Sequence, residues 1–169
     1  WSENRNGNWD LMGRKYTDGT ASQIISITNS PEPDTFHKMT TDAAGNIWLT
    51  WQSYRYGNSD IFVKKYNGNE WEDTIPVTTD PGNDWEPVIT ADSKENVFVA
   101  WDTYRNGNYD VYLAEIKDGT VSRTIPVAAS EDFEGYVSIA SDKNDRVWIA
   151  WENGGPDWGK DHAGALGYR

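Results

Sequence analysis

Three arginines recur at a fixed spacing, and arginine is the side chain best suited to holding a carboxylate. Arg5, Arg55 and Arg105 are each 50 residues apart. A guanidinium can donate two parallel hydrogen bonds to one carboxylate, so arginines that converged on one pocket would bind an acidic ligand. An Asp also stands five residues after each arginine, at Asp10, Asp60 and Asp110. The simpler prediction is a local ion pair in each copy, with the charged atoms within ~4 Å.

Acidic and aromatic side chains gather near these arginines in segments that do not repeat. Loops between expected strands carry Tyr54, Phe36 and Phe133 among several carboxylates. Aromatic faces stack on the C–H surfaces of sugars, and carboxylates accept hydroxyl protons. We therefore expect this face to bind carbohydrate or a protein or peptide ligand. The residues of this face that we predict to bind the ligand are Arg55, Asp84, Trp85, Tyr104 and Arg105.

The chain abandons its own pattern after Trp151. Residues 153–162 replace the hairpin of the earlier copies and bring Trp158, Lys160 and Asp161 close together in sequence. We predict that these three also contact the ligand and that residues 153–163 fold back over the acidic face. The alternative is a linker at a domain junction, where the propeller ends. A lone His162 beside two Asp is too little to indicate a metal site. No nucleophile, base and orienting group can be assembled either, so no metal or cofactor is predicted.

The elements that must hold these side chains follow from the same 50-residue period. Trp1, Trp51, Trp101 and Trp151 mark it, and the residues between them align without a gap. A Gly-Asn pair in each copy suits a tight turn with positive φ, at Gly7, Gly57 and Gly107. An Asp in each copy is placed to accept a backbone N–H and hold a turn, at Asp42, Asp92 and Asp142. A period of ~40 to 50 residues indicates either a propeller or a helical array.

The pattern inside one period decides between the two. In the second copy, residues 61–66, 72–78, 86–91 and 97–101 are strand-like runs separated by turn residues. No stretch shows the apolar periodicity of a helix. The sequence therefore predicts an all-β fold, a β-propeller fragment made of four-stranded antiparallel blades.

The repeat resembles the TolB-type, WD-like β-propeller family. The shared pieces are the turn at Asp92, the strand 97–101 (Val-Phe-Val-Ala-Trp) and the hairpin 105–112 (Arg-Asn-Gly-Asn-Tyr-Asp-Val-Tyr). This resemblance covers the whole chain and implies the fold far more than a function. Residues 151–161 are also similar to a motif of uncharacterised secreted bacterial proteins in which a propeller precedes another domain.

The period divides the chain into about three blade equivalents. We expect a single propeller segment, 1–169, with blade parts 1–30, 31–80, 81–130 and 131–169, in which residues 9–28 supply two outer strands of the first blade. A single closed propeller has at least ~4 blades. We therefore expect the remaining blades, or other domains, to belong to a longer parent protein. Unpaired edge strands would favour association with them.

Composition excludes some partners. The 27 acidic and 15 basic side chains give a net charge of -12, which repels phosphate backbones and anionic lipid surfaces, so neither nucleic acid nor membrane is expected. There is no Cys, and no apolar run of the ~18 residues that a membrane span needs. We expect a secreted, periplasmic or cell-surface location, with the export signal not visible in this sequence.

These observations favour a non-catalytic ligand-binding or scaffolding module of a secreted or cell-surface bacterial protein, rather than an enzyme. The alternative is a fragment of a sialidase-like or other glycoside-processing enzyme, with catalytic carboxylates among Asp84, Glu86 and Glu134. Against the sialidase form, the stretch from Asp42 to Gly45 has one residue too many for a sialidase Asp box. A third hypothesis is a structural module whose open edges join other blades.

Overall fold

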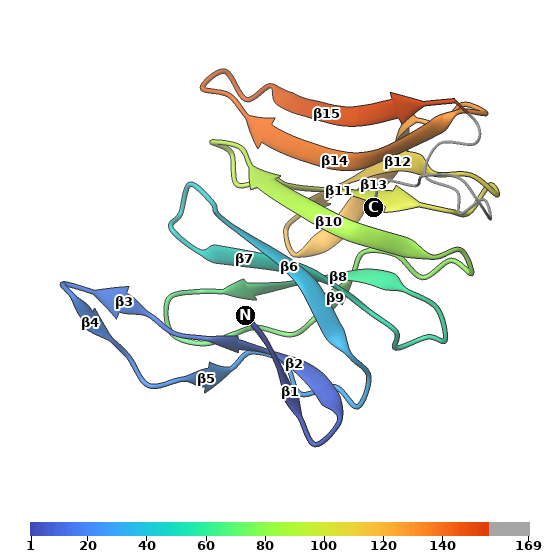
Figure 1. Ribbon diagram of the computed structural model, residues 1–169. Helices are drawn as coiled ribbons and strands as arrows, with labels where there is room; N and C mark the ends of the chain where they lie inside the picture. Colours follow the sequence, from blue (N-terminus) through green and yellow to red (C-terminus); the bar gives the residue numbers. More distant parts are fainter. Residues whose placement is uncertain (156–169) are drawn as a thin grey trace.

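All regular structure in the protein is extended. The computed structural model describes residues 1–155, and every helix or strand element in that range is a β-strand (Figure 1). Within this range there is thus no helix capable of spanning a membrane. Two antiparallel sheets are complete, with the strand orders β6-β7-β8-β9 and β10-β11-β12-β13. Their strands are β6 (Asp34–Thr41), β7 (Ile47–Ser53), β8 (Asp60–Tyr66), β9 (Ile75–Pro76), β10 (Asp84–Ala91), β11 (Val97–Thr103), β12 (Asp110–Lys117) and β13 (Thr120–Ala128). The predicted all-β fold of four-stranded antiparallel propeller blades is confirmed.

The sheets on either side of these two blades have fewer strands. One has the order β1-β2-β5, the other pairs β14 with β15, and a separate hairpin joins β3 to β4. Their strands are β1 (Ser2–Arg5), β2 (Asn8–Gly13), β3 (Tyr16–Thr17), β4 (Thr20–Ala21), β5 (Ile25–Ser26), β14 (Phe133–Ser141) and β15 (Val147–Gly154). The first blade therefore has a third strand, β1, beyond the two outer strands expected from residues 9–28.

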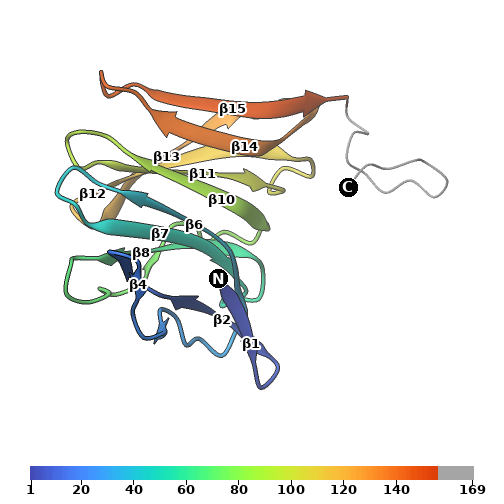
Figure 2. The same cartoon turned by 60° about the vertical axis from the view of Figure 1, so that its left-hand side comes forward.

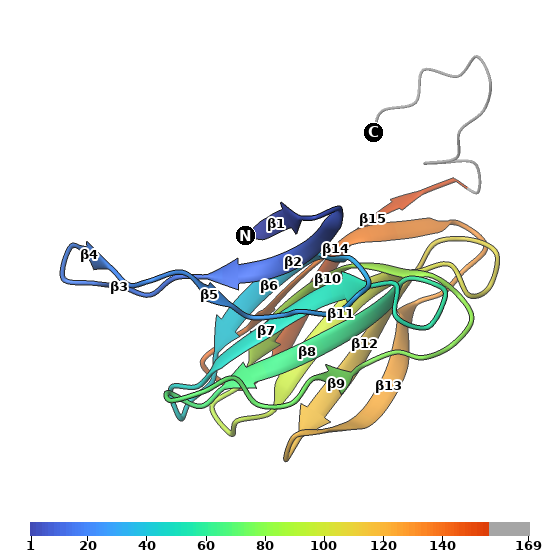
Figure 3. The ribbon, with the colours of Figure 1, turned by 90° about the horizontal axis from the view of Figure 1, so that it is seen from below.

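The four sheets follow one another in chain order, as successive blades do. In Figure 2 the β14-β15 sheet lies at one end of the stack and β1-β2 at the other. The β3-β4 hairpin projects away from this body (Figure 3). Because consecutive sheets face each other, the innermost strands β6, β10 and β14 lie near one another, and contacts join β10 to both β6 and β14.

Each inner hairpin is held by the Asp that the repeat predicts. Asp42 Oδ1 accepts the backbone N–H of Asn46 at 2.9 Å, and its Oδ2 accepts the indole N–H of Trp48 at 2.8 Å. Asp92 Oδ1 accepts the backbone N–H groups of Lys94 and Asn96 at 2.8 and 2.9 Å. The backbone N–H groups of these turns would otherwise lack partners, so the predicted structural role is confirmed.

The core lies between the sheets, because successive residues of a strand face opposite neighbours. Trp48 in β7 packs with Ile89, Val97 and Val99 of the following sheet in one buried cluster. On the other face of β11, Phe98 and Ala100 belong to a second cluster, together with residues of β14. Every complete blade therefore buries both of its faces.

Candidate functional site

The innermost strand of three successive sheets carries the same irregularity. The pairing register shifts between Thr35 and Lys38 in β6, and equivalent shifts occur in β10 and β14. Each bulge holds a non-glycine residue at positive φ: Phe36 at 51°, Glu86 at 49° and Tyr136 at 54°. A β-bulge changes the direction of a side chain. The repeat therefore places one redirected side chain at the same position of the innermost strand in each of these three sheets.

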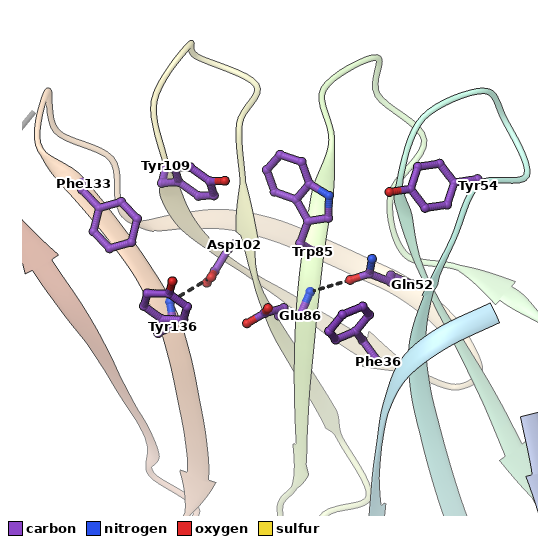
Figure 4. Close-up of a pocket in the computed structure, with 9 residues that line it drawn as sticks. All are labelled: Phe36, Gln52, Tyr54, Trp85, Glu86, Asp102, Tyr109, Phe133 and Tyr136. Carbon is purple, nitrogen blue, oxygen red and sulfur yellow. Dashed lines mark hydrogen bonds between the residues drawn. The ribbon is translucent and has the colours of Figure 1, made fainter. Parts of the chain in front are cut away.

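Side chains of the neighbouring sheet fix two of these bulges. Gln52 in β7 accepts the backbone N–H of Glu86 through Oε1 at 2.9 Å. Asp102 in β11 accepts the backbone N–H of Tyr136 through Oδ2 at 2.8 Å, and both bonds are drawn in Figure 4. Gln52 and Asp102 are 50 residues apart. The same type of hydrogen bond, from a backbone N–H at a bulge to a side-chain oxygen of the preceding sheet, therefore joins two successive pairs of sheets.

A pocket of about 340 Å³ opens at this level. It falls at the small end of the ~300–1,000 Å³ typical of ligand sites. Side chains from neighbouring strands converge on it in Figure 4. The residues that line it are Phe36, Gln52, Tyr54, Trp85, Glu86, Asp102, Tyr109, Phe133 and Tyr136.

Aromatic rings form a nearly continuous wall of this pocket. The ring centroids of Trp85 and Tyr109 lie 5.5 Å apart, and those of Tyr109 and Phe133 lie 5.3 Å apart. Phe133 and Tyr136 follow at 5.8 Å. Rings that pack on one another lose little mobility when a ligand binds, so the wall is preorganised.

The two carboxyl groups of the pocket differ in environment. Burial raises the pKa of Asp102 to about 6; the N–H bonds from Tyr136 and Val137 oppose this rise, and the charge of Glu86 adds to it. Glu86 is exposed to solvent. None of the described residues donates a hydrogen bond to its carboxylate. One carboxyl group is therefore biased toward its protonated form, while the other is free to contact a ligand.

Several positions of the pocket hold different residues in different copies of the repeat. Glu86 takes the position of Phe36 and Tyr136, and Asp102 that of Gln52. Gly135 stands where the second copy has Trp85, and a Cβ at Gly135 would lie 2.9 Å from the Phe133 ring and 3.2 Å from Asp102 Oδ2. The missing side chain therefore makes room for the carboxyl group and the ring.

The arginines predicted to bind a ligand are instead engaged within their own blades. Arg55 Nη2 lies 3.1 Å from both carboxylate oxygens of Asp34. Arg105 Nη2 contacts Asp84 at 3.2 Å and Asp80 at 2.8 Å. The predicted pairs with the Asp five residues later are therefore wrong, and Arg5 pairs with the exposed Glu3 instead.

The cause lies in the order of the strands. β7 runs between β6 and β8, so Ser53 has Asp34 on one side and Asp60 on the other. Arg55 turns toward β6, where Asp34 also accepts the indole N–H of Trp51 at 2.9 Å. This partner is 21 residues away in sequence and lies outside the hairpin that carries Arg55.

The remaining predicted residues have different positions. Trp85 lines the pocket, and Tyr104 packs behind it, with ring centroids 6.4 Å from Trp85 and 5.2 Å from Tyr109. Asp84 is fully buried and accepts the indole N–H of Trp101 at 2.9 Å. Its carboxylate faces the blade interior, beside Arg105. The other three predicted residues, Trp158, Lys160 and Asp161, lie outside residues 1–155. Of the segment 153–163 expected to fold over the face, Asn153 and Gly154 instead continue β15, paired with Glu134 and Phe133 of β14, and residues 156–163 lie outside the described range.

Four lining residues were not among the sequence candidates: Gln52, Asp102, Tyr109 and Tyr136. Each of Asp102 and Tyr109 stands in a column of the repeat where every copy has a different residue, so the repeat itself does not single out either one. Within residues 1–155 no group of three His, Cys, Asp or Glu side chains is arranged to hold a metal ion.

Comparisons with known proteins bear on this fold. No protein-family model matches the chain, and no curated protein matches it. Among solved structures it is similar to the endo-arabinase from Bacteroides thetaiotaomicron VPI-5482, with 16% sequence identity and a TM-score of 0.53. The alignment covers 89% of this chain and 68% of the endo-arabinase chain. This likeness supports the β-propeller fold, while membership of the TolB-type family stays a prediction.

The comparison also corrects one expectation. The sequence favoured a protein that is not an enzyme, but the similar structure is that of an enzyme, so this expectation is contradicted. Of the carboxylates considered for the enzymatic alternative, Glu86 lies in the pocket. Asp84 and Glu134 are both buried, and Glu134 accepts hydrogen bonds from Ser130.

Proposed function

We propose that this chain is part of a glycoside-processing β-propeller whose pocket binds a neutral glycan and places Asp102 and Glu86 at the bond to be cleaved. The observation that carries the proposal is the pairing of a buried carboxyl group, whose pKa is raised to about 6, with an exposed carboxylate in one aromatic pocket. Glycoside hydrolysis commonly needs such a pair, one group protonated and the other charged.

The lining favours a sugar without acidic groups. Six of its nine residues are aromatic, and Lys and Arg are absent from it. Arg55 and Arg105 point instead to carboxylates of their own blades. A sialidase-like site would need such arginines at the ligand, so a neutral glycan fits better. The similarity to an endo-arabinase makes arabinan the first polymer to test.

The environments of the two carboxyl groups suggest their roles. Asp102 keeps a proton to a higher pH than an ordinary Asp and can donate it to the leaving oxygen. Glu86 retains a charge that can activate water or stabilise the developing positive charge on the sugar. Cleavage should therefore fall as the pH rises through about 6, since Asp102 then loses its proton.

As part of the same proposal, we expect the parent protein to lie outside the cytoplasm, because a polymeric glycan would reach its pocket at the cell surface. The resemblance of residues 151–161 to a motif of secreted bacterial proteins supports it. Fractionation of cells that produce the parent protein would test it, and recovery in the cytoplasm alone would contradict it.

The function can be tested by release of reducing sugar ends from arabinan and a panel of other neutral polysaccharides. Glu86→Gln and Asp102→Asn should each lower the rate by ~10²-fold or more while binding persists. An amide should be tolerated at position 102, because Gln52 holds the equivalent bulge through an amide oxygen. Glu70→Gln, in an exposed turn, is the control. No release from any polymer, or equal rates in all variants, would contradict the proposal.

A further inference from the structure

The aromatic pocket has two sides of different chemistry, which meet at Glu86 on β10 (Figure 4). One side holds Asp102 and the aromatic wall. The other side comes from the preceding blade, where Phe36, Gln52 and Tyr54 line the pocket and none of them is charged. It lies between the two complete blades, β6-β9 and β10-β13. A neutral, partly apolar group of a ligand therefore fits this second side.

The side chain of Gln52 has one polar atom left for that group. The residue is only 4% exposed, and its Oε1 accepts the backbone N–H of Glu86 at 2.9 Å. Because a backbone N–H bonds to the oxygen of an amide, this contact fixes which end of the amide is the nitrogen. None of the described residues accepts a hydrogen bond from Nε2, and in Figure 4 this atom points away from Glu86, to the side of Tyr54 and Trp85. The pocket therefore contains an N–H₂ donor that is held in place.

The repeat shows that the scaffold does not require this donor. Asp102 takes the place of Gln52 in the next blade and holds the bulge at Tyr136 through a carboxylate oxygen, 2.8 Å from the backbone nitrogen. An oxygen is thus sufficient for the bond to the bulge, and a carboxylate supplies it as well as an amide does. A donor in a largely buried side chain costs free energy when it has no partner. We therefore expect the ligand to supply that partner.

The surroundings of Nε2 restrict the group that it can bind. This group must accept a hydrogen bond, since Nε2 only donates. The charge of Glu86 and the net charge of -12 oppose a carboxylate, sulfate or phosphate. The carbonyl of an acetyl group fits better, because its methyl end can pack on the rings of Phe36, Tyr54 and Trp85. An acetamido group also carries an N–H, which an acetyl ester lacks, and a carboxylate oxygen of Glu86 is available to accept it.

We propose that Gln52 determines the specificity of the pocket by binding the acetamido carbonyl of an N-acetylated sugar. Gln52 Nε2 donates to the carbonyl oxygen, the methyl group packs on the rings of the same side, and one oxygen of Glu86 accepts the N–H. This inference rests on the proposed function and names its substrate class more closely. Among neutral glycans, those that carry acetamido groups should bind best.

Chitotriose and cellotriose are matched probes, because they differ only in the acetamido or hydroxyl group that each ring carries. In calorimetry at pH 8 the wild type should bind chitotriose at least ~10-fold more tightly than cellotriose. Asp102, whose pKa is about 6, has lost its proton at this pH, so the proposed cleavage is suppressed during the titration. Gln52→Glu keeps an oxygen for the N–H of Glu86 but replaces the donor by an acceptor. It should abolish the preference for chitotriose and change the affinity for cellotriose less than ~3-fold.

A matched control and a second acetylated probe test the assignment. Gln23→Glu makes the same change at an exposed position and should keep the preference. Circular dichroism would show that both variants fold. The proposal would be overturned by a wild type that does not bind chitotriose or binds both trisaccharides equally, or by a preference that survives Gln52→Glu. Tighter binding of O-acetylated xylotriose than of chitotriose would overturn the assignment to an acetamido group.

The same titrations separate this inference from the proposed function. Release of reducing ends that depends on Glu86 and Asp102, without a preference for chitotriose, would leave the proposed function standing and overturn the role of Gln52. A preference for chitotriose that is lost in Gln52→Glu, without release of reducing ends from any polymer, would support the role of Gln52 and contradict the proposed cleavage.

Discussion

Replacing Asp60 by Asn should stabilise the protein at neutral pH, although it removes a charge from a buried network. Asp60 is fully buried, and its Oδ2 has no hydrogen-bond partner among the described residues. Burial raises the pKa of this carboxyl group from 3.8 to about 6; the hydroxyl of Thr78 opposes this rise, and the charges of Asp84 and Asp80 add to it. The ionised form is therefore less stable in the folded protein than in the unfolded chain.

The magnitude follows from this difference. A rise of the pKa from 3.8 to about 6 corresponds to about 3 kcal/mol lost from the free energy of unfolding when Asp60 is charged. Below the unfolded pKa both states are protonated, so nothing is lost there. The loss grows as the pH rises through about 6 and is constant above it. An Asn side chain avoids the charge but leaves a buried N–H group to satisfy, which costs about 1–2 kcal/mol.

Urea unfolding of the wild type and Asp60→Asn at several pH values between 4 and 8 would measure this effect. We expect Asp60→Asn to be about 1–2 kcal/mol more stable than the wild type at pH 7 but less stable than the wild type at pH 4, because only the wild type loses stability as the pH rises. Asp110→Asn is the matched control. Burial raises the pKa of Asp110 as well, but both of its carboxylate oxygens accept amide N–H groups, from Asn106 and Asn108 at 2.7 and 3.1 Å, so an Asn there should bring a smaller gain. A difference between wild type and Asp60→Asn that does not vary with pH would refute the reasoning.

Three further predictions concern the blades and the pocket. Arg105→Met leaves the buried Asp84 without its cation and should lower the free energy of unfolding by about 3–5 kcal/mol, whereas Arg5→Met, which affects an exposed pair, should cost under ~1 kcal/mol in the same urea assay. Asp92→Ala should cost about 0.5–2 kcal/mol through its lost turn bonds without changing glycan affinity, and an unchanged melting temperature would contradict it. Trp85→Ala should weaken glycan binding by about 1–3 kcal/mol in calorimetry, with Tyr56→Ala unchanged; equal affinities would exclude the pocket.

The fold could be predicted because the repeat expresses backbone requirements that are local. Gly57 and Gly107 adopt φ of 93° and 87° in their turns, as the Gly-Asn pairs require. Asp92 bonds within four residues of itself, so its role is visible in the sequence. The partner of Arg55 could not be predicted from the hairpin that carries it, because Asp34 lies on β6, the strand that pairs with the other edge of β7. A contact across two strands depends on strand order, which composition does not specify.

The pocket was only partly predictable, for a related reason. Trp85 was predicted from its place in a loop and Glu86 as a candidate carboxylate, whereas Asp102 lies on the central strand β11, just beyond the predicted strand 97–101, and was not among the candidates. Its importance depends on the bulge of the next sheet, 34 residues away, which brings Tyr136 N–H to its carboxylate. Nothing local to Asp102 indicates that bulge.

The bulges explain how one repeating scaffold can acquire a specific site. Left-handed backbone at a non-glycine residue costs of order 1–2 kcal/mol, and it occurs at Phe36, Glu86 and Tyr136 alike. Since the cost recurs whether the residue is an aromatic or a carboxylate, it belongs to the scaffold and not to the ligand. Each blade thus presents one position whose side chain can change without altering the backbone. Among these three positions only that of Glu86 carries a carboxylate. Asp102 lines the same pocket, whereas its counterpart Gln52 has no charge. The part of the described chain where β10 and β11 approach β14 is therefore the specialised part of the scaffold.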